Sequence, residues 1–144
     1  NFRCGESRTI LQIRMDKIKL VSNTRIYIDV NTLLDEILDI TPNFPHAYKY
    51  TIGANMHTLG VQLLQDIAAA YMNKNRATRI DYLVAFQIKF ETLKTLMRKA
   101  GERQWIKGKG RHAHIIELMD AIGKQGTAWK NSLIKVREQP EPES

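Results

Sequence analysis

The stretch HAYKYTIGANMHTLGVQLLQDIAAAYMN, residues 46–73, decides the fold because its apolar side chains recur at spacings of three and four. That period places them on one face of an α-helix, whereas a half-buried strand would alternate at every second residue. Glycine inside a helix costs about 1 kcal/mol relative to alanine, so we expect Gly53 and Gly60 to allow close approach of a neighbouring helix. The stretch predicts one long helix with a single buried face. Its apolar stripe consists of Tyr48, Ile52, Met56, Leu59, Leu63, Ile67 and Tyr71.

The segment Thr41-Pro42-Asn43-Phe44-Pro45 separates this helix from a shorter amphipathic one before it. Each proline lacks an amide donor and disfavours helix at the preceding residue, and Pro45 also suits the first turn of the next helix. We expect Asp29 or Asn31 to cap the shorter helix with a side-chain oxygen. Its apolar face consists of Val30, Leu33, Leu34, Ile37 and Leu38. We interpret its acidic residues as a solvated surface and not as an acid/base pair. They are Asp35, Glu36 and Asp39.

Two further helices follow. The polar turn at residues 73–78 leads into a helix that Asn75 or Thr78 is expected to cap and Gly101 to stop. A glycine-containing loop at residues 102–111 then leads into a fourth amphipathic segment. Four such segments with short connections predict an all-α fold, an antiparallel up-and-down four-helix bundle over residues 30–137.

The two ends of the chain differ in charge. Residues 1–29 are interpreted as a basic N-terminal extension, in which helical and strand periods both fit the part up to residue 23. Residues 138–144 form an acidic tail whose last six residues we expect to be disordered. The cations of the extension, a candidate basic arm, are Arg3, Arg8, Arg14, Lys17 and Lys19.

The charge balance indicates a polyanionic or acidic partner. The 144 residues include 22 Lys and Arg and 15 Asp and Glu, a net charge of +7. All 22 basic residues lie at or before Arg137, so the chain up to that residue has 22 basic against 12 acidic residues, or +10. Such an excess attracts phosphate polymers or an acidic protein surface. A merely soluble basic protein is the alternative.

Motifs for catalysis, metal or membrane insertion are not apparent. His112 and His114 are two residues apart, which suits no helical zinc site, and Cys4 has no histidine nearby to activate it. A single cysteine favours a reducing compartment, and no apolar run approaches the ~20 residues of a membrane span. We therefore expect a cytoplasmic protein that is not an enzyme and has no cofactor or metal.

Basic side chains gather at two predicted turns, which lie at opposite ends of an up-and-down bundle. Lys and Arg around flexible glycines suit phosphate contacts, which give affinity without reading sequence. Trp105, in the denser group, either stacks on a base or packs against its own bundle, and the sequence leaves both open. The candidate residues for binding nucleic acid or a partner are Arg76 and Arg79 at one turn and Arg98, Lys99, Arg103, Trp105, Lys107, Lys109 and Arg111 at the other.

Three short motifs occur in a particular order along the chain. They are Phe44-Pro45-His46, Lys49-Tyr50-Thr51-Ile52-Gly53, and Ile122-Gly123-Lys124 followed by Trp129. With these motifs, residues 32–133 resemble the four-helix-bundle family of the accessory variability proteins (Avd) of diversity-generating retroelements. That family also contains proteins encoded in intervening sequences of bacterial large-subunit ribosomal RNA genes. His46 stands where the family commonly has arginine, which weakens a phosphate-binding role for this position.

The resemblance implies a homopentamer of bundles that serves as a basic partner of a reverse transcriptase and of RNA or an RNA/DNA hybrid. It adds Lys49 and Lys124 to the candidate binding residues. The alternative that it leaves open is an oligomeric scaffold or ribosome-associated protein of the intervening-sequence type. Structural roles are implied for Phe44, Pro45, Gly53, Gly123 and Trp129.

Overall fold

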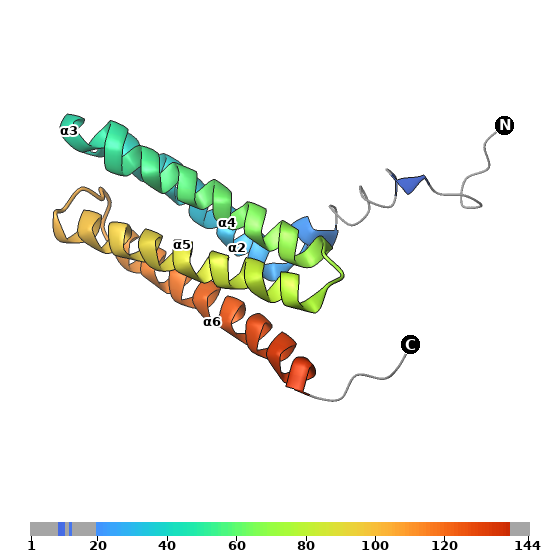
Figure 1. Cartoon of the computed structure of the whole chain (residues 1–144). Helices are drawn as coiled ribbons and strands as arrows, with labels where there is room; N and C mark the ends of the chain where they lie inside the picture. Colours follow the sequence, from blue (N-terminus) through green and yellow to red (C-terminus); the bar gives the residue numbers. More distant parts are fainter. Residues whose placement is uncertain (1–8, 11, 13–19, 139–144) are drawn as a thin grey trace.

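The computed structural model describes residues 9–10, 12 and 20–138, with side chains up to residue 135, and its main feature is a bundle of four long helices (Figure 1). The helix α2 packs against α4 and α6, and α5 packs against the same two, so the four close around a main core, with a second small apolar cluster of Ala70, Ile80, Leu83 and Leu133. This confirms the predicted all-α fold, and the described residues contain no strand. The long helices are α2 (Arg25–Ile40), α4 (Ala54–Met72), α5 (Arg76–Glu102) and α6 (Arg111–Glu138).

Three short elements join α2 to α4. A 3₁₀ turn, η1 (Thr41–Asn43), is followed by α3 (His46–Tyr48) and by a π-helical turn, η2 (Lys49–Gly53), which runs directly into α4. The predicted helix over residues 46–73 is therefore present, with a π-helical turn that its apolar period did not indicate. Such turns hold an extra residue and are frequent at functional sites.

Gly60 allows α4 to pack closely against α2, as predicted, whereas a side chain at Gly53 would meet only ordinary van der Waals contacts. A Cβ at Gly60 would lie 2.9 Å from Leu34 Cδ1, and a Cβ at Gly53 would lie 3.5 Å from Thr41 Cβ. Thr41 is itself buried and its Oγ1 shares a hydrogen bond of 2.6 Å with His57 Nε2. The connection is thus held tightly against the first turns of α4.

The predicted stop at Gly101 is wrong, because Gly101 lies inside the last turn of α5. There it packs against the ring of His112, which a Cβ would clash with. The helix ends one residue later, at Glu102, and the left-handed residue of the turn that follows is Gln104, with a φ of +62°. The amide of Gln104 donates to the carbonyl of Gly101 at 3.0 Å, and that of Trp105 to the carbonyl of Ala100 at 2.9 Å, which satisfies two final carbonyls.

The start of α2 also differs from the prediction. Asp29 and Asn31 lie inside this helix, so neither is its cap. Val21 and Ile26 are buried in the core, which therefore continues upstream of residue 30. The predicted cap of α5 is correct, since Asn75 Oδ1 accepts from the amide of Thr78 at 3.0 Å. The proposed basic arm, Arg3, Arg8, Arg14, Lys17 and Lys19, lies outside the described residues, as do residues 139–144.

One charged pair lies at the edge of the core between α4 and α5. Asp66 is only 6 % exposed, and its carboxylate accepts a hydrogen bond of 2.9 Å from Lys89 Nζ. Burying a carboxylate without a cation costs several kcal/mol of stability. The charge of Lys89 therefore offsets the cost of burying the Asp66 carboxylate. The pair also joins α4 to α5.

We expect Lys89→Met to destabilise the fold by about 2 kcal/mol, because Asp66 loses its cation while it stays buried. The double change Asp66→Leu and Lys89→Met should recover most of this loss, since no charge is left in the interface. Chemical denaturation followed by circular dichroism measures both. Arg25→Met is the control, because Asp29 keeps its hydrogen bond of 2.7 Å from Gln125 Nε2. A Lys89→Met protein as stable as the parent chain would contradict this role for the pair.

Candidate nucleic-acid interface

The connection after α2 and the loop after α5 meet at one end of the bundle (Figure 1). We call residues 41–53 and 98–111 the Trp105 end. The ring of Trp105 stacks on Tyr48, with centroids 4.8 Å apart and planes 26° apart, and lies 5.1 Å from the ring of Phe44. Trp105 therefore packs against its own bundle, which is one of the two roles that the sequence left open.

Arg103 lies over this aromatic cluster. Its guanidinium carbon is 5.6 Å from the centroid of Trp105 and 5.9 Å from that of Tyr48, within the range of cation–π attraction. No carboxylate pairs with it in the described part of the chain. The rings thus hold Arg103 in place and leave its N–H groups to solvent or to a ligand.

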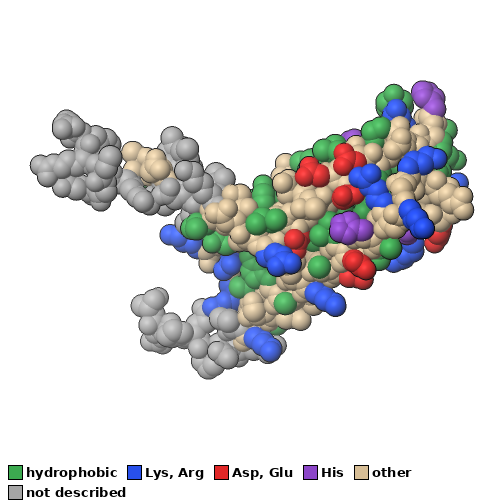
Figure 2. Space-filling view, turned by 180° about the vertical axis from the view of Figure 1, so that it is seen from behind, with side chains coloured by type: hydrophobic (Ala, Val, Ile, Leu, Met, Phe, Trp, Pro, Cys, Tyr) green, Lys and Arg blue, Asp and Glu red, His purple; other side chains and the backbone are tan. Residues whose placement is uncertain are grey.

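The Trp105 end holds seven Lys and Arg residues against one acidic residue, Glu102. Lys107 and Lys109 are exposed in the loop, and Arg98 and Lys99 are exposed in the last turns of α5. Within residues 20–135 none of these four has a carboxylate partner. Figure 2 shows several Lys and Arg side chains at the end of the bundle away from the grey chain ends, and others along the rest of this face. The charge of this end is therefore available to an anionic ligand.

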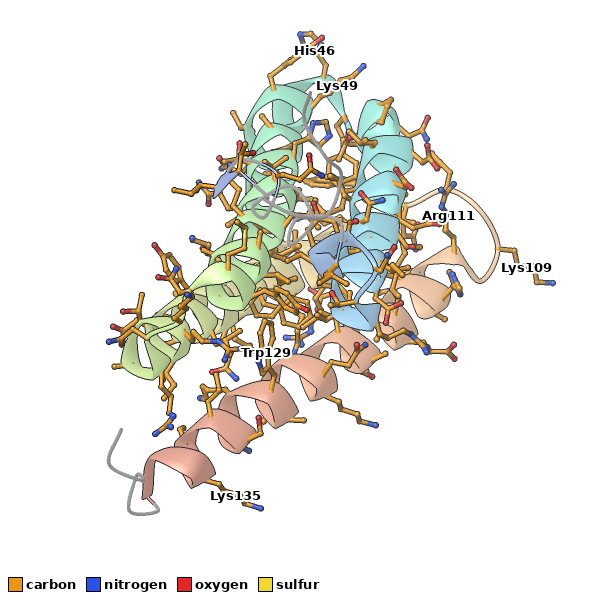
Figure 3. All side chains as sticks on the ribbon, turned by 90° about the vertical axis from the view of Figure 1, so that its right-hand side faces the viewer. His46, Lys49, Lys109, Arg111, Trp129 and Lys135 are labelled. Carbon is orange, nitrogen blue, oxygen red and sulfur yellow. The ribbon has the colours of Figure 1, made fainter. Side chains whose placement is uncertain are left out.

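Arg111, in contrast, is occupied by the bundle itself. Its Nε donates to Glu36 at 2.9 Å and its Nη2 to Asp39 at 3.2 Å, so it joins the start of α6 to α2. The hydrogen bond to Glu36 raises the pKa of the Arg111 guanidinium more than burial lowers it. Figure 3 shows Arg111 beside α2, whereas Lys109 points away from the bundle. Glu36, which was expected to be solvated, is thus half-buried against Arg111, whereas Asp39 pairs with Arg111 and stays 65 % exposed.

Arg76 and Arg79 lie at the opposite end, in the first turn of α5. Arg79 Nε donates to the carbonyl of Ala70 at 2.9 Å, and its guanidinium carbon lies 5.9 Å from the centroid of Trp129. These contacts join α4, α5 and α6, so Arg79 holds helices together at this end. Arg76 is half-buried beside it. The structure does not bring these two arginines together with the larger basic group.

Lys124 lies on a third surface. It lines an open groove of about 720 Å³ between α5 and α6, whose floor is formed by Phe86, Phe90 and Met119. Glu91 and Asp120 line the same groove, so its charge is mixed. Lys124 is therefore separate from the basic Trp105 end, although the family resemblance groups it with Lys49.

Lys49 is at the Trp105 end, in η2. Its Nζ lies 6.0 Å from the centroid of the neighbouring Tyr50, and both Lys49 and His46 point away from the bundle in Figure 3. Tyr50 is exposed, and sequence reasoning did not single it out for binding. The signal was the alternation Tyr48-Lys49-Tyr50, which interleaves aromatic and basic side chains in the way that nucleic-acid sites do.

The part of the chain that the structure describes contains neither a metal site nor a membrane-spanning helix. No group of three or more His, Cys, Asp or Glu side chains is placed to hold a metal ion. No described helix is long and apolar enough to cross a membrane.

Comparison with known proteins identifies the family. No curated protein matches the chain. A family model described as bAvd-like matches residues 20–133, which span the bundle from the turn before α2 to the last turns of α6. The match covers all three motifs that resemble accessory variability proteins. The chain therefore belongs to the bAvd-like family.

Proposed function

We propose that this protein is a non-catalytic accessory subunit of a diversity-generating retroelement, which binds RNA and a reverse transcriptase through the Trp105 end. The observation that carries the proposal is the set of exposed cations there that have no carboxylate partner among the described residues, with Lys107 and Lys109 foremost. Family membership supplies the retroelement context.

The chemistry of the Trp105 end suits phosphate groups. Lys side chains act as mobile point charges, and the guanidinium of Arg103 offers several N–H donors in one plane. Contacts of this kind bind a nucleic-acid backbone and give little sequence readout. An accessory protein that handles a long template needs such general affinity, and the enzyme supplies the chemistry.

We further propose that the protein assembles as a homopentamer, as the family resemblance implies. Ile88 on α5 is 65 % exposed, and Val84 one turn earlier is also exposed. Contiguous exposed apolar side chains commonly mark protein–protein contacts. Five copies would present five Trp105 ends, and multivalent contact raises avidity without a new interaction.

A ribosome-associated protein of the intervening-sequence type is the second candidate, because its family relationship and its basic surface would be the same. Gene neighbourhood separates the two. A reverse transcriptase gene with template and variable repeats beside this one favours the retroelement role, and a position inside a ribosomal RNA gene favours the other.

RNA affinity should depend on the two loop lysines. We expect Lys107→Gln with Lys109→Gln to weaken binding of a fluorescein-labelled RNA by about tenfold at moderate salt, and to lower the slope of log affinity against log salt by about 2. Fluorescence anisotropy over a salt series measures both. Lys74→Gln with Lys135→Gln is the matched control, because it removes the same charge from exposed sites elsewhere. Equal loss in the two variants would show that net charge acts, and not this site.

Arg111 should behave differently from Lys109. Because Arg111 bonds to Glu36 and Asp39, we expect Arg111→Ala to lower the free energy of unfolding by about 1 kcal/mol and to change RNA affinity little. Lys109→Ala should weaken RNA binding and leave the free energy of unfolding nearly unchanged. Thermal unfolding and anisotropy on both variants test this pair of outcomes. If Arg111→Ala weakened RNA binding as much as Lys109→Ala without loss of stability, Arg111 would be a ligand contact.

The assembly should have a mass five times the 16.6 kDa of one chain, as measured by size-exclusion chromatography with light scattering. Ile88→Lys should shift the mass towards that of one chain while the far-ultraviolet circular dichroism is unchanged, because a charge would be buried in the contact. Val61→Lys, at an exposed apolar site on α4, is the control. A parent chain that elutes as a monomer at all concentrations contradicts the assembly. Dissociation by Val61→Lys alone would place the contact on α4.

A further inference from the structure

We propose that the Tyr50 ring is a stacking platform for an unpaired base, so that the Trp105 end selects single-stranded over double-stranded nucleic acid. This inference rests on the proposed function, because it assumes that nucleic acid binds at this end. It goes further in naming the form of nucleic acid and the residue that selects it.

The Tyr50 side chain contributes little to the packing of the bundle. Its side chain is 70 % exposed, whereas Tyr48 two residues earlier is stacked on Trp105. The ring contacts of Tyr50 are with His46, edge to face at a centroid distance of 5.7 Å, and with Lys49 Nζ. Among the described residues, no aromatic or cation contact of this ring is with a core residue. One face of an aromatic ring is therefore left for a ligand.

The backbone holds this ring in a defined place. Lys49 and Tyr50 lie in the π-helical turn η2, between the short α3 and the long α4. The turn is anchored on its inner side, where Gly53 packs against Thr41 and Phe44. A platform on a rigid turn loses less conformational entropy on binding than one on a flexible loop.

The charge around the ring fits a nucleic-acid strand. Lys49 approaches the ring itself, and Lys99 and Arg103 line a small pocket of about 110 Å³ with Tyr48 and Trp105 at the same end. Proteins that bind single strands combine a basic surface along the backbone with aromatic rings on which bases stack. The Trp105 end has both parts, and the aromatic part is the one that a duplex cannot use.

A duplex covers the faces of its bases by stacking them on one another, so an exposed ring meets only its backbone and groove edges. A single strand exposes base faces, and every base has such a face, so stacking is tolerant of sequence. The cations attract both forms, whereas Tyr50 favours the unpaired one. The selectivity therefore resides in one side chain.

The test uses fluorescence anisotropy with four labelled probes at low salt: oligo(U) and oligo(dT) of about 15 nucleotides, a hairpin duplex, and an abasic strand of equal length. We expect Tyr50→Ala to weaken binding of oligo(U) and oligo(dT) by about tenfold and to leave the duplex unchanged. Tyr50→Phe should bind like the parent chain, because it keeps the ring. The parent chain should bind the abasic strand as weakly as Tyr50→Ala binds oligo(U).

Tyr82→Ala is the control, since Tyr82 is an exposed tyrosine on α5 away from this end. Unchanged binding of oligo(U) by Tyr50→Ala, with loss on Lys107→Gln and Lys109→Gln, overturns the stacking role and leaves the proposed function intact. Equal loss of single strand and duplex on Tyr50→Ala also overturns it. Absence of binding to all four probes by the parent chain overturns both proposals.

Discussion

The packing of Trp105 against Tyr48 and Phe44 is the contact on which the Trp105 end depends. It joins two connections that are far apart in the sequence, one before α4 and one after α5, and so it fixes both to the same end of the bundle. Aromatic pairs contribute about 0.5–1.5 kcal/mol beyond the area they bury. The left-handed backbone at Gln104 turns the chain so that Trp105 reaches this position. Without that packing, no contact of Trp105 would hold the loop cations, Lys107 and Lys109, beside the connection after α2.

The cations of the described residues differ in what lies opposite them, and two classes matter for binding. Lys89 faces a buried carboxylate on the next helix, and Arg111 faces two carboxylates on α2, so these charges hold helices together. Lys107 and Lys109 face solvent. The formal charge of +7 is therefore a poor measure of what a ligand meets, because it counts both classes alike. The local excess at the Trp105 end is the relevant quantity for binding.

The sequence predicts the parts of this structure that depend on local chemistry. The spacing of the apolar residues predicts the helices. Asn75 predicts the start of α5, because a capping side chain bonds to an amide only three residues away. The sequence does not show contacts between distant residues. The pairing of Arg111 with Glu36 spans 75 positions, so Arg111 looked like a free cation of the loop. Gly101 looked like a helix stop for the same reason, since its constraint comes from the ring of His112.

A protein without chemistry of its own changes a reaction only by binding one state of the substrate better than another. Phosphate contacts favour the duplex if they favour either form, because the phosphates of a duplex are more closely spaced than those of a single strand. The cations therefore supply affinity but do not favour the unpaired form. If a ring such as that of Tyr50 engages only unpaired bases, its extra binding free energy acts wholly on the paired–unpaired equilibrium, by mass action. A template held unpaired is the form that a polymerase copies. Under the proposed function, an aromatic side chain beside a basic surface would thus link a non-catalytic bundle to the copying step, through the conformation of the template and without any contact to the reacting atoms.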